Sequence, residues 1–183
     1  MNKSLKSNQI KIPKNITVSV DKITNEITLS GNHGNFKLIL NKNINVIINE
    51  SDYIVLEVLN ITKEDKKYLG LYSSLLKKNL KGISQKFKLN IFLNGIGFKV
   101  KKIENNLVFK LGYSHDIIFG IPKDIEVSIV KMTQIIVYGS NWSKLTQFAH
   151  NIKRLKKVEP YKGKGILLKN EKILRKEGKK NKK

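Results

Sequence analysis

Residues 44–48 of the chain have the sequence Ile-Asn-Val-Ile-Ile, and residues 53–59 have Tyr-Ile-Val-Leu-Glu-Val-Leu. A shift of 81 residues superimposes Ile44, Val46 and Ile48 on Ile125, Val127 and Ile129, and residues 54–56 on the apolar run 135–137. Apolar residues that alternate with polar ones are typical of half-buried β-strands. The repeat therefore predicts two copies of one structural unit.

Each copy is predicted to hold several short strands followed by one helix. The strands are bounded by Asn, Gly, Asp or Ser and are expected at residues 16–20, 26–30, 36–40, 44–48 and 53–59, then at 87–93, 98–103, 107–111, 117–121, 126–130 and 135–138. The expected helix caps are Thr62, and Ser140 or Asn141, and Gly82 is expected to end the first helix. The apolar helix faces are predicted at Tyr68, Leu71, Tyr72 and Leu75, and at Leu145, Phe148, Ala149, Ile152 and Leu155.

These elements predict an α+β fold of two duplicated domains, each a small, mainly antiparallel sheet with one packed helix, plus a basic C-terminal tail. The expected boundaries are a polar leader at 1–11, an N-terminal domain at 12–81, a C-terminal domain at 82–158 and a tail at 159–183. A Gly-x-Gly run at residues 95–97 lies between two predicted strands, where a bulge or tight hairpin is expected rather than a dinucleotide loop.

Composition restricts the possible partners. The chain has a formal net charge of +22 and no cysteine, which excludes disulfides and thiolate metal sites. The three histidines are scattered, so no metal or other cofactor is expected. No apolar run is long enough to cross a bilayer, and the first residues lack the apolar segment of a secretory signal. Such an excess of lysine favours an anionic partner, which is nucleic acid or a membrane surface.

The excess charge is concentrated at the C-terminal end. The 31 residues from Lys153 to Lys183 hold 14 Lys or Arg and only three Asp or Glu. Within this run, Pro160 is expected to end the second helix and Tyr161 offers a flat ring. Glycines without a Cβ at positions 163 and 165 would let the backbone approach a phosphate closely, beside lysines 162 and 164.

The run Glu159-Pro160-Tyr161-Lys162-Gly163-Lys164-Gly165-Ile166, followed by Arg175-Lys176-Glu177-Gly178, resembles the C-terminal signature of large-subunit ribosomal protein six of the bacterial type. The resemblance extends over roughly residues 12–180, although the N-terminal basic motif and the first helix match poorly. It implies a structural, non-enzymatic protein that binds large-subunit rRNA near the translation-factor, GTPase-associated region. Neighbouring ribosomal proteins are the other implied partners, without a membrane or small-molecule substrate.

The rRNA contacts are expected mainly in the second domain and the tail. The candidate residues are Lys99, Lys153, Arg154, Lys156, Lys157, Tyr161, Lys162, Gly163, Lys164, Gly165, Lys169, Arg175 and Lys176. Deleting residues 161–183 is expected to leave both domains folded but to weaken assembly. The abundance of Lys, Asn and Ile suggests an A/T-rich genome and hence a mitochondrial ribosome, with a plastid or an A/T-rich bacterial cytoplasm as alternatives.

Two other classes of function stay open from the residues alone. A small basic α+β enzyme acting on phosphorylated or nucleic-acid substrates would need an acid/base pair, and His115 beside Asp116 in the turn 111–116 is the nearest candidate. That turn matches a structural segment of the ribosomal family. A peripheral membrane protein attracted by its lysines is the third hypothesis.

Overall fold

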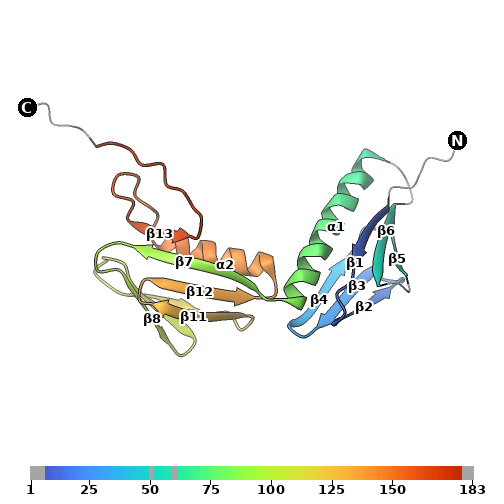
Figure 1. Ribbon diagram of the computed structural model, residues 1–183, viewed down its shortest axis with the longest axis horizontal. Coiled ribbons are helices and arrows are strands. Elements are labelled where there is room, and N and C mark those ends of the chain that lie inside the picture. The colour runs from blue at the N-terminus through green and yellow to red at the C-terminus, as the bar shows by residue number, and fades with distance from the viewer. Residues whose placement is uncertain (1–6, 50–51, 59–61, 179–183) are drawn as a thin grey trace, which may run out of the picture. The chain divides into compact units, whose positions relative to one another are not determined.

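The computed structural model describes residues 7–49, 52–58 and 62–178, and Figure 1 shows its helices and strands. The chain divides into two compact units, residues 1–86 and 87–183. In its described residues each unit contains two small antiparallel sheets and one long helix, which confirms the predicted α+β class.

The first unit contains six strands and the helix α1. Its sheets have the strand orders β1-β6-β5 and β2-β3-β4. The bounds are β1 Ser7–Lys11, β2 Ile16–Asp21, β3 Glu26–Gly31, β4 Gly34–Ile39, β5 Ile44–Asn49, β6 Tyr53–Val58 and α1 Lys63–Ser84. Both sheets and α1 contribute to one apolar core, in which Ile27, Leu29, Ile54, Leu56 and Leu76 are fully buried.

The second unit repeats this plan with one additional strand. Its sheets have the orders β10-β9-β8 and β11-β12-β7-β13. The bounds are β7 Phe87–Asn94, β8 Lys99–Ile103, β9 Asn106–Lys110, β10 Ile117–Gly120, β11 Ile125–Lys131, β12 Gln134–Gly139, α2 Trp142–Leu155 and β13 Gly165–Leu168. Leu107, Phe109, Ile135, Leu145 and Ile166 are fully buried in its core.

The registers agree with the internal repeat. In the first unit Ile10 of β1 pairs with Ile54 of β6, and in the second Ile91 of β7 pairs with Ile135 of β12. The triplet β1-β6-β5 therefore corresponds to β7-β12-β11.

Side-chain caps fix where the helices begin. The Thr62 hydroxyl accepts a hydrogen bond from the Asp65 N–H at 3.2 Å, and the Asn141 side chain accepts from the N–H groups of Ser143 and Lys144. Both caps are as predicted. The predicted end of α1 at Gly82 is wrong, because α1 continues to Ser84. The division between the units accordingly falls after residue 86 and not after 81.

The predicted buried face of α1 is only partly correct, since Tyr72 packs against the core but the centre of the buried face lies one residue further along. Tyr68 and Leu71 are exposed, whereas Leu69, Leu76 and Leu80 are buried. One residue on a helix corresponds to a rotation of about 100°. The apolar residues on adjacent positions define two overlapping stripes, and the stripe that continues through Leu80 and Ile83 is the one that packs.

Part of the predicted leader belongs to the first unit. Residues 7–11 form β1, and Ile10 is buried in the core. The pairing of β1 with β6 explains why a largely polar segment is ordered, since Ile10 is the one buried side chain among residues 8–11. Residues 1–6, and residue 59 of the predicted strand 53–59, lie outside the described residues.

The tail is likewise not a separate arm. Residues 165–168 form β13, which pairs antiparallel with β7, and Ile166 is fully buried. The deletion of residues 161–183 would remove core side chains of the second unit, so we expect that unit to be destabilised, while the core of the first unit stays complete. Residues 179–183 lie outside the described part of the chain.

Residues 95–97 do not form a tight hairpin between neighbouring strands. The strand β7 before them and β8 after them belong to different sheets, and the Phe98 N–H donates to the Gly95 carbonyl at 3.2 Å. The turn thus transfers the chain from one sheet to the other. Gly97 has φ +78° there, a value that favours glycine.

Candidate nucleic-acid interface

The last turn of α2 and the residues after it present four cations with different surroundings. Arg154 and Lys157 are exposed. Lys153 forms a salt bridge with Glu171, and the Lys156 ammonium lies 4.1 Å from the centre of the Tyr113 ring. Two of the four predicted contact residues thus have partners within the protein, while Arg154 and Lys157 face solvent.

Glu171 connects the C-terminal segment to α2. Its carboxylate accepts hydrogen bonds from the Lys153 ammonium and from the Leu168 N–H. The Lys153 ammonium, and to a smaller extent the Leu168 N–H, lower the pKa of this carboxyl below its ordinary value of 4.5, against an opposing effect of burial. The carboxylate is therefore charged at neutral pH.

Residues 159–164 form a closed loop before β13. The Glu159 N–H donates to the Lys164 carbonyl at 2.8 Å, and the Gly163 N–H donates to the Glu159 carbonyl at 2.9 Å. These bonds leave the side chains of Tyr161 and Lys162 exposed on the outside of the loop. The hydrogen-bonded backbone of the loop therefore presents an aromatic ring and a lysine side chain at the surface.

Contacts within the protein explain why glycine is found at position 163 in this loop and at position 165 at the start of β13. Gly163 has φ +69°, and a Cβ there would lie 3.5 Å from the Arg175 guanidinium. Gly165 has φ +145° and is buried, and a Cβ there would lie only 2.6 Å from the Cα of Val158. The sequence predicted that the missing Cβ at Gly165 would let a phosphate approach the backbone. In the structure it is the chain's own backbone at Val158 that approaches.

The segment after β13 turns back onto the loop. The Lys169 N–H donates to the Asn90 carbonyl, and the Lys176 N–H donates to the Pro160 carbonyl at 3.1 Å. Residues 154–164 and 169–176 are thereby gathered beside β13, and the side chains of Lys169, Arg175 and Lys176 are exposed. We call this set of exposed residues the C-terminal basic face: Arg154, Lys157, Tyr161, Lys162, Lys169, Arg175 and Lys176.

Lys99 has different neighbours from the other candidates. It lies on β8 beside a shallow pocket of about 470 Å³ that Lys101, Lys110 and Met132 also line.

Sequence reasoning missed the role of Tyr113 and the two lysines of the β8–β9 pocket. The Tyr113 hydroxyl donates to the Leu155 carbonyl at 3.1 Å, which stabilises the end of α2 and places the ring under Lys156. The alternation of lysines 99 and 101 on one strand was the available signal for the pocket, because alternate residues share one face.

Other chemistries find little support in the described residues. No group of three His, Asp or Glu side chains could hold a metal ion there. In the same part of the chain, no helix is long and apolar enough to cross a bilayer. His115 is exposed, with Ser114 Oγ 3.5 Å from its Nδ1.

Comparison with known proteins identifies the family. The family model described as Ribosomal protein L6 matches residues 94–168. The large ribosomal subunit protein uL6m of Reclinomonas americana is 41% identical over 182 residues, which cover 95% of this chain and 97% of the relative. The uL6 proteins of Mycoplasmoides gallisepticum and Spiroplasma citri are 38% and 35% identical over 171 residues, 93% of this chain and 92% and 94% of the relatives. Since these relatives align over nearly their whole length, the chain belongs to the large ribosomal subunit protein uL6 family, whose members are structural ribosomal proteins and not enzymes.

Proposed function

We propose that this structural ribosomal protein binds large-subunit rRNA through its C-terminal basic face, close to the translation-factor, GTPase-associated region. The observation that carries the proposal is the set of six exposed cations at Arg154, Lys157, Lys162, Lys169, Arg175 and Lys176, on a segment that the fold itself holds in place. Residues 153–178 contain ten Lys or Arg and three Asp or Glu. One of those three acids, Glu171, is already paired with Lys153.

The expected mechanism is neutralisation of backbone phosphates. Each neutralised phosphate releases counterions, and this release supplies most of the sequence-independent affinity for RNA. Because β13 and the loop 159–164 are hydrogen-bonded, little chain entropy is lost when the cations contact RNA. The exposed ring of Tyr161 is available to stack on an unpaired base, which is worth roughly 1–3 kcal/mol.

The pocket beside Lys99 is a second contact area within this proposal. Lysines 99, 101 and 110 come from two neighbouring strands and line one concave surface. Asp116 also lines this surface, so a phosphate there would be near three lysines and one carboxylate, and the remaining positive charge favours a backbone contact without sequence specificity.

The proposed location is the mitochondrial ribosome. The abundance of residues with A/T-rich codons favours an organellar or A/T-rich bacterial genome. Similarity to the uL6m protein of Reclinomonas americana, in whose name m marks the mitochondrial form, favours the mitochondrion.

A binding experiment with matched variants tests the rRNA contact. The Lys157→Gln/Arg175→Gln variant and the control Lys66→Gln/Lys67→Gln remove equal charge, and all four side chains are exposed. Filter binding to a large-subunit rRNA transcript is measured over a range of salt concentrations. If both residues of the first pair contact phosphates, its slope of log K against log[salt] becomes shallower by about 1.4–1.8. Equal losses in the two variants would contradict the proposed face.

Footprinting tests the position on the rRNA. Hydroxyl-radical cleavage of large subunits that contain the full-length protein, compared with subunits that lack it, should show protection in the GTPase-associated region. Protection confined to other rRNA domains would refute that position while leaving rRNA binding itself intact.

A further inference from the structure

The corresponding sheets of the two units differ by one strand. In the second unit β7 has β12 on one side and β13 on the other. In the first unit the equivalent strand, β1, pairs with β6, and the described residues place no strand on its other side. One edge of β1 therefore presents backbone N–H and C=O groups in the position that β13 occupies in the other unit.

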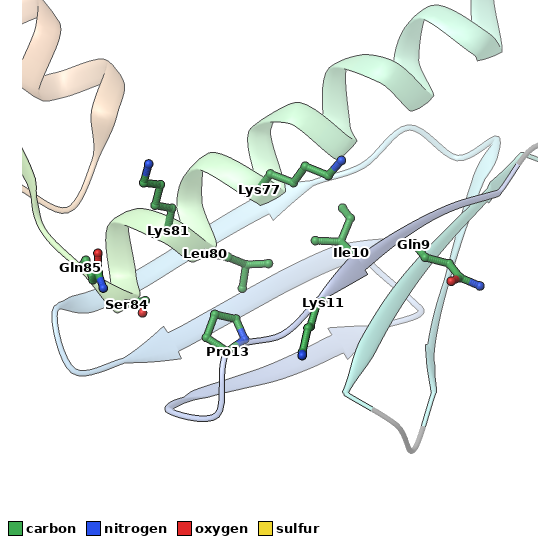
Figure 2. A pocket seen from close by; sticks show the side chains of 9 residues that line it. All are labelled: Gln9, Ile10, Lys11, Pro13, Lys77, Leu80, Lys81, Ser84 and Gln85. Carbon is green, nitrogen blue, oxygen red and sulfur yellow. The ribbon is translucent and has the colours of Figure 1, made fainter.

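A pocket lies beside this edge, between β1 and the C-terminal half of α1. Figure 2 shows Ile10 on β1 and Leu80 on α1, which line the same space between strand and helix. The pocket has a volume of about 390 Å³. In the second unit, the residue in the comparable place is Ile166 of β13, which contributes to the core and is fully buried.

The polar groups around the pocket give it a positive charge. Lys11 comes from β1, and Lys77 and Lys81 come from successive turns of α1, where residues four apart share a face. Figure 2 shows all three lysines together with the amides of Gln9 and Gln85. Among the described residues no carboxylate forms a salt bridge with any of the three lysines.

We propose that this edge receives an extended, acidic segment of a neighbouring protein as an additional strand. The segment pairs antiparallel with β1, as β13 pairs with β7. One of its apolar side chains enters the space over Ile10 and Leu80, and its carboxylates are attracted by the positive charge of Lys11 on β1 and of Lys77 and Lys81 on α1. This inference rests on the proposed function in one respect, which is that the partner is expected in the large ribosomal subunit.

A protein segment fits this site better than RNA does. The groups offered along the edge of a strand match those of another peptide backbone. The residues that line the pocket include no aromatic ring or arginine on which an unpaired base could stack. The first unit is also less positively charged than the second, since it holds 14 of the 36 basic residues and half of the 14 acidic ones, and this makes it the less suitable unit for RNA.

The test uses the full-length protein and a short peptide that alternates glutamate with isoleucine. Two-dimensional NMR should show chemical-shift changes at the amides of residues 9–11 and 77–85, with slower amide exchange along β1. A peptide with lysine in place of glutamate and a single-stranded RNA oligonucleotide serve as comparison probes. Binding of the acidic peptide elsewhere, no binding, or RNA binding at these amides would each overturn the proposal.

Charge-reversal variants test the role of the lysines. The Lys77→Glu/Lys81→Glu variant should bind the acidic peptide about tenfold more weakly, because two attractive charges become repulsive. The matched control Lys66→Glu/Lys67→Glu makes the same change on exposed residues nearer the start of α1 and should bind as the unmodified protein does. Circular dichroism checks that both variants are folded, and equal weakening in both would contradict the site.

Cross-linking in assembled subunits separates this proposal from the proposed function. A photoreactive residue at position 81 of the full-length protein should cross-link to an acidic protein segment, identified by mass spectrometry. Cross-links to rRNA alone, or none from subunits that contain the protein, would refute the strand site while leaving ribosomal incorporation intact. Absence of the protein from the subunits would instead count against the proposed function, and the peptide experiment would then decide the strand site.

Discussion

Gly165 shows how one missing atom determines the course of the C-terminal segment. The residue is buried at the start of β13, and its backbone passes beside that of residues 157–158. Only glycine allows both that approach and a φ of +145°. Ile166 next to it can therefore reach the core, while Lys157 and Lys162 stay at the surface.

The Gly165→Ala variant should lose roughly 2–4 kcal/mol of unfolding free energy, because the added Cβ meets backbone atoms and the φ angle is unfavourable. Gly163→Ala should cost only about 1 kcal/mol, since its Cβ meets side-chain atoms at 3.5 Å. Gly178→Ala is the control, because nothing lies within 4 Å of its Cβ position. Urea unfolding measures all three, and equal stability of the Gly165 and Gly178 variants would refute the steric explanation.

At the scale of elements, β13 and the segment after it attach to the second unit in two ways. The strand pairs with β7, and Glu171 connects to α2 through Lys153. Hydrophobic burial provides the larger free energy, since Ile166 and Leu167 are each nearly inaccessible to solvent. The salt bridge contributes less because both its side chains are about one-third exposed, but it depends on pH.

The salt bridge predicts a pH-dependent difference between the protein and its Glu171→Gln variant. Pairing lowers the pKa of Glu171 in the folded state below 4.5. A carboxylate with a lowered pKa stabilises the fold above the unfolded-state pKa, and this contribution disappears as the pH falls through the folded-state pKa. The variant should thus be less stable by roughly 0.5–1 kcal/mol at neutral pH and indistinguishable at strongly acidic pH. Urea unfolding at both pH values provides the measurement, with Glu159→Gln as an exposed control.

Deleting residues 161–183 should destabilise the second unit by roughly 3–6 kcal/mol, the value expected for losing two buried aliphatic side chains. A shorter deletion of residues 172–183 keeps β13 and Glu171 and should cost about 1 kcal/mol or less. Thermal unfolding followed by circular dichroism distinguishes the two truncations. Equal melting temperatures would mean that β13 contributes no stability.

The same elements show what the sequence could and could not predict. The strand 44–48 was predictable because its apolar residues partly alternate with polar ones, and 135–138 because it is a short apolar run that repeats residues 54–56 of the first unit. The strands β1 and β13 were missed because they are stabilised by pairing with β6 and β7. Local composition does not reveal such pairing between distant segments. For the candidate site, the excess of lysine identified the region, but the pairing of Lys153 with Glu171 and of Lys156 with Tyr113 depends on residues distant in sequence.

For the whole molecule, duplication has produced two units with similar folds and unequal charge. Residues 87–183 hold 22 of the 36 basic residues and seven of the 14 acidic ones. The second unit also has its strand edge filled by β13, whereas the described residues place no strand on the corresponding edge of β1. In our two proposals the copies bind different partners: the second unit binds a polyanion and the first a protein segment.

This division predicts different behaviour of the two halves when they are produced separately. Residues 87–183 should bind a large-subunit rRNA transcript with a slope of log K against log[salt] of roughly −4 to −5, as expected if about six exposed cations each contact a phosphate. Residues 1–86 should bind with a much smaller slope, because their positive charge is less concentrated. Each half has its own apolar core, so circular dichroism can verify folding before filter binding is measured. A first half that matched the slope of the second would show that rRNA affinity follows total charge, and that the arrangement of cations around β13 adds nothing to it.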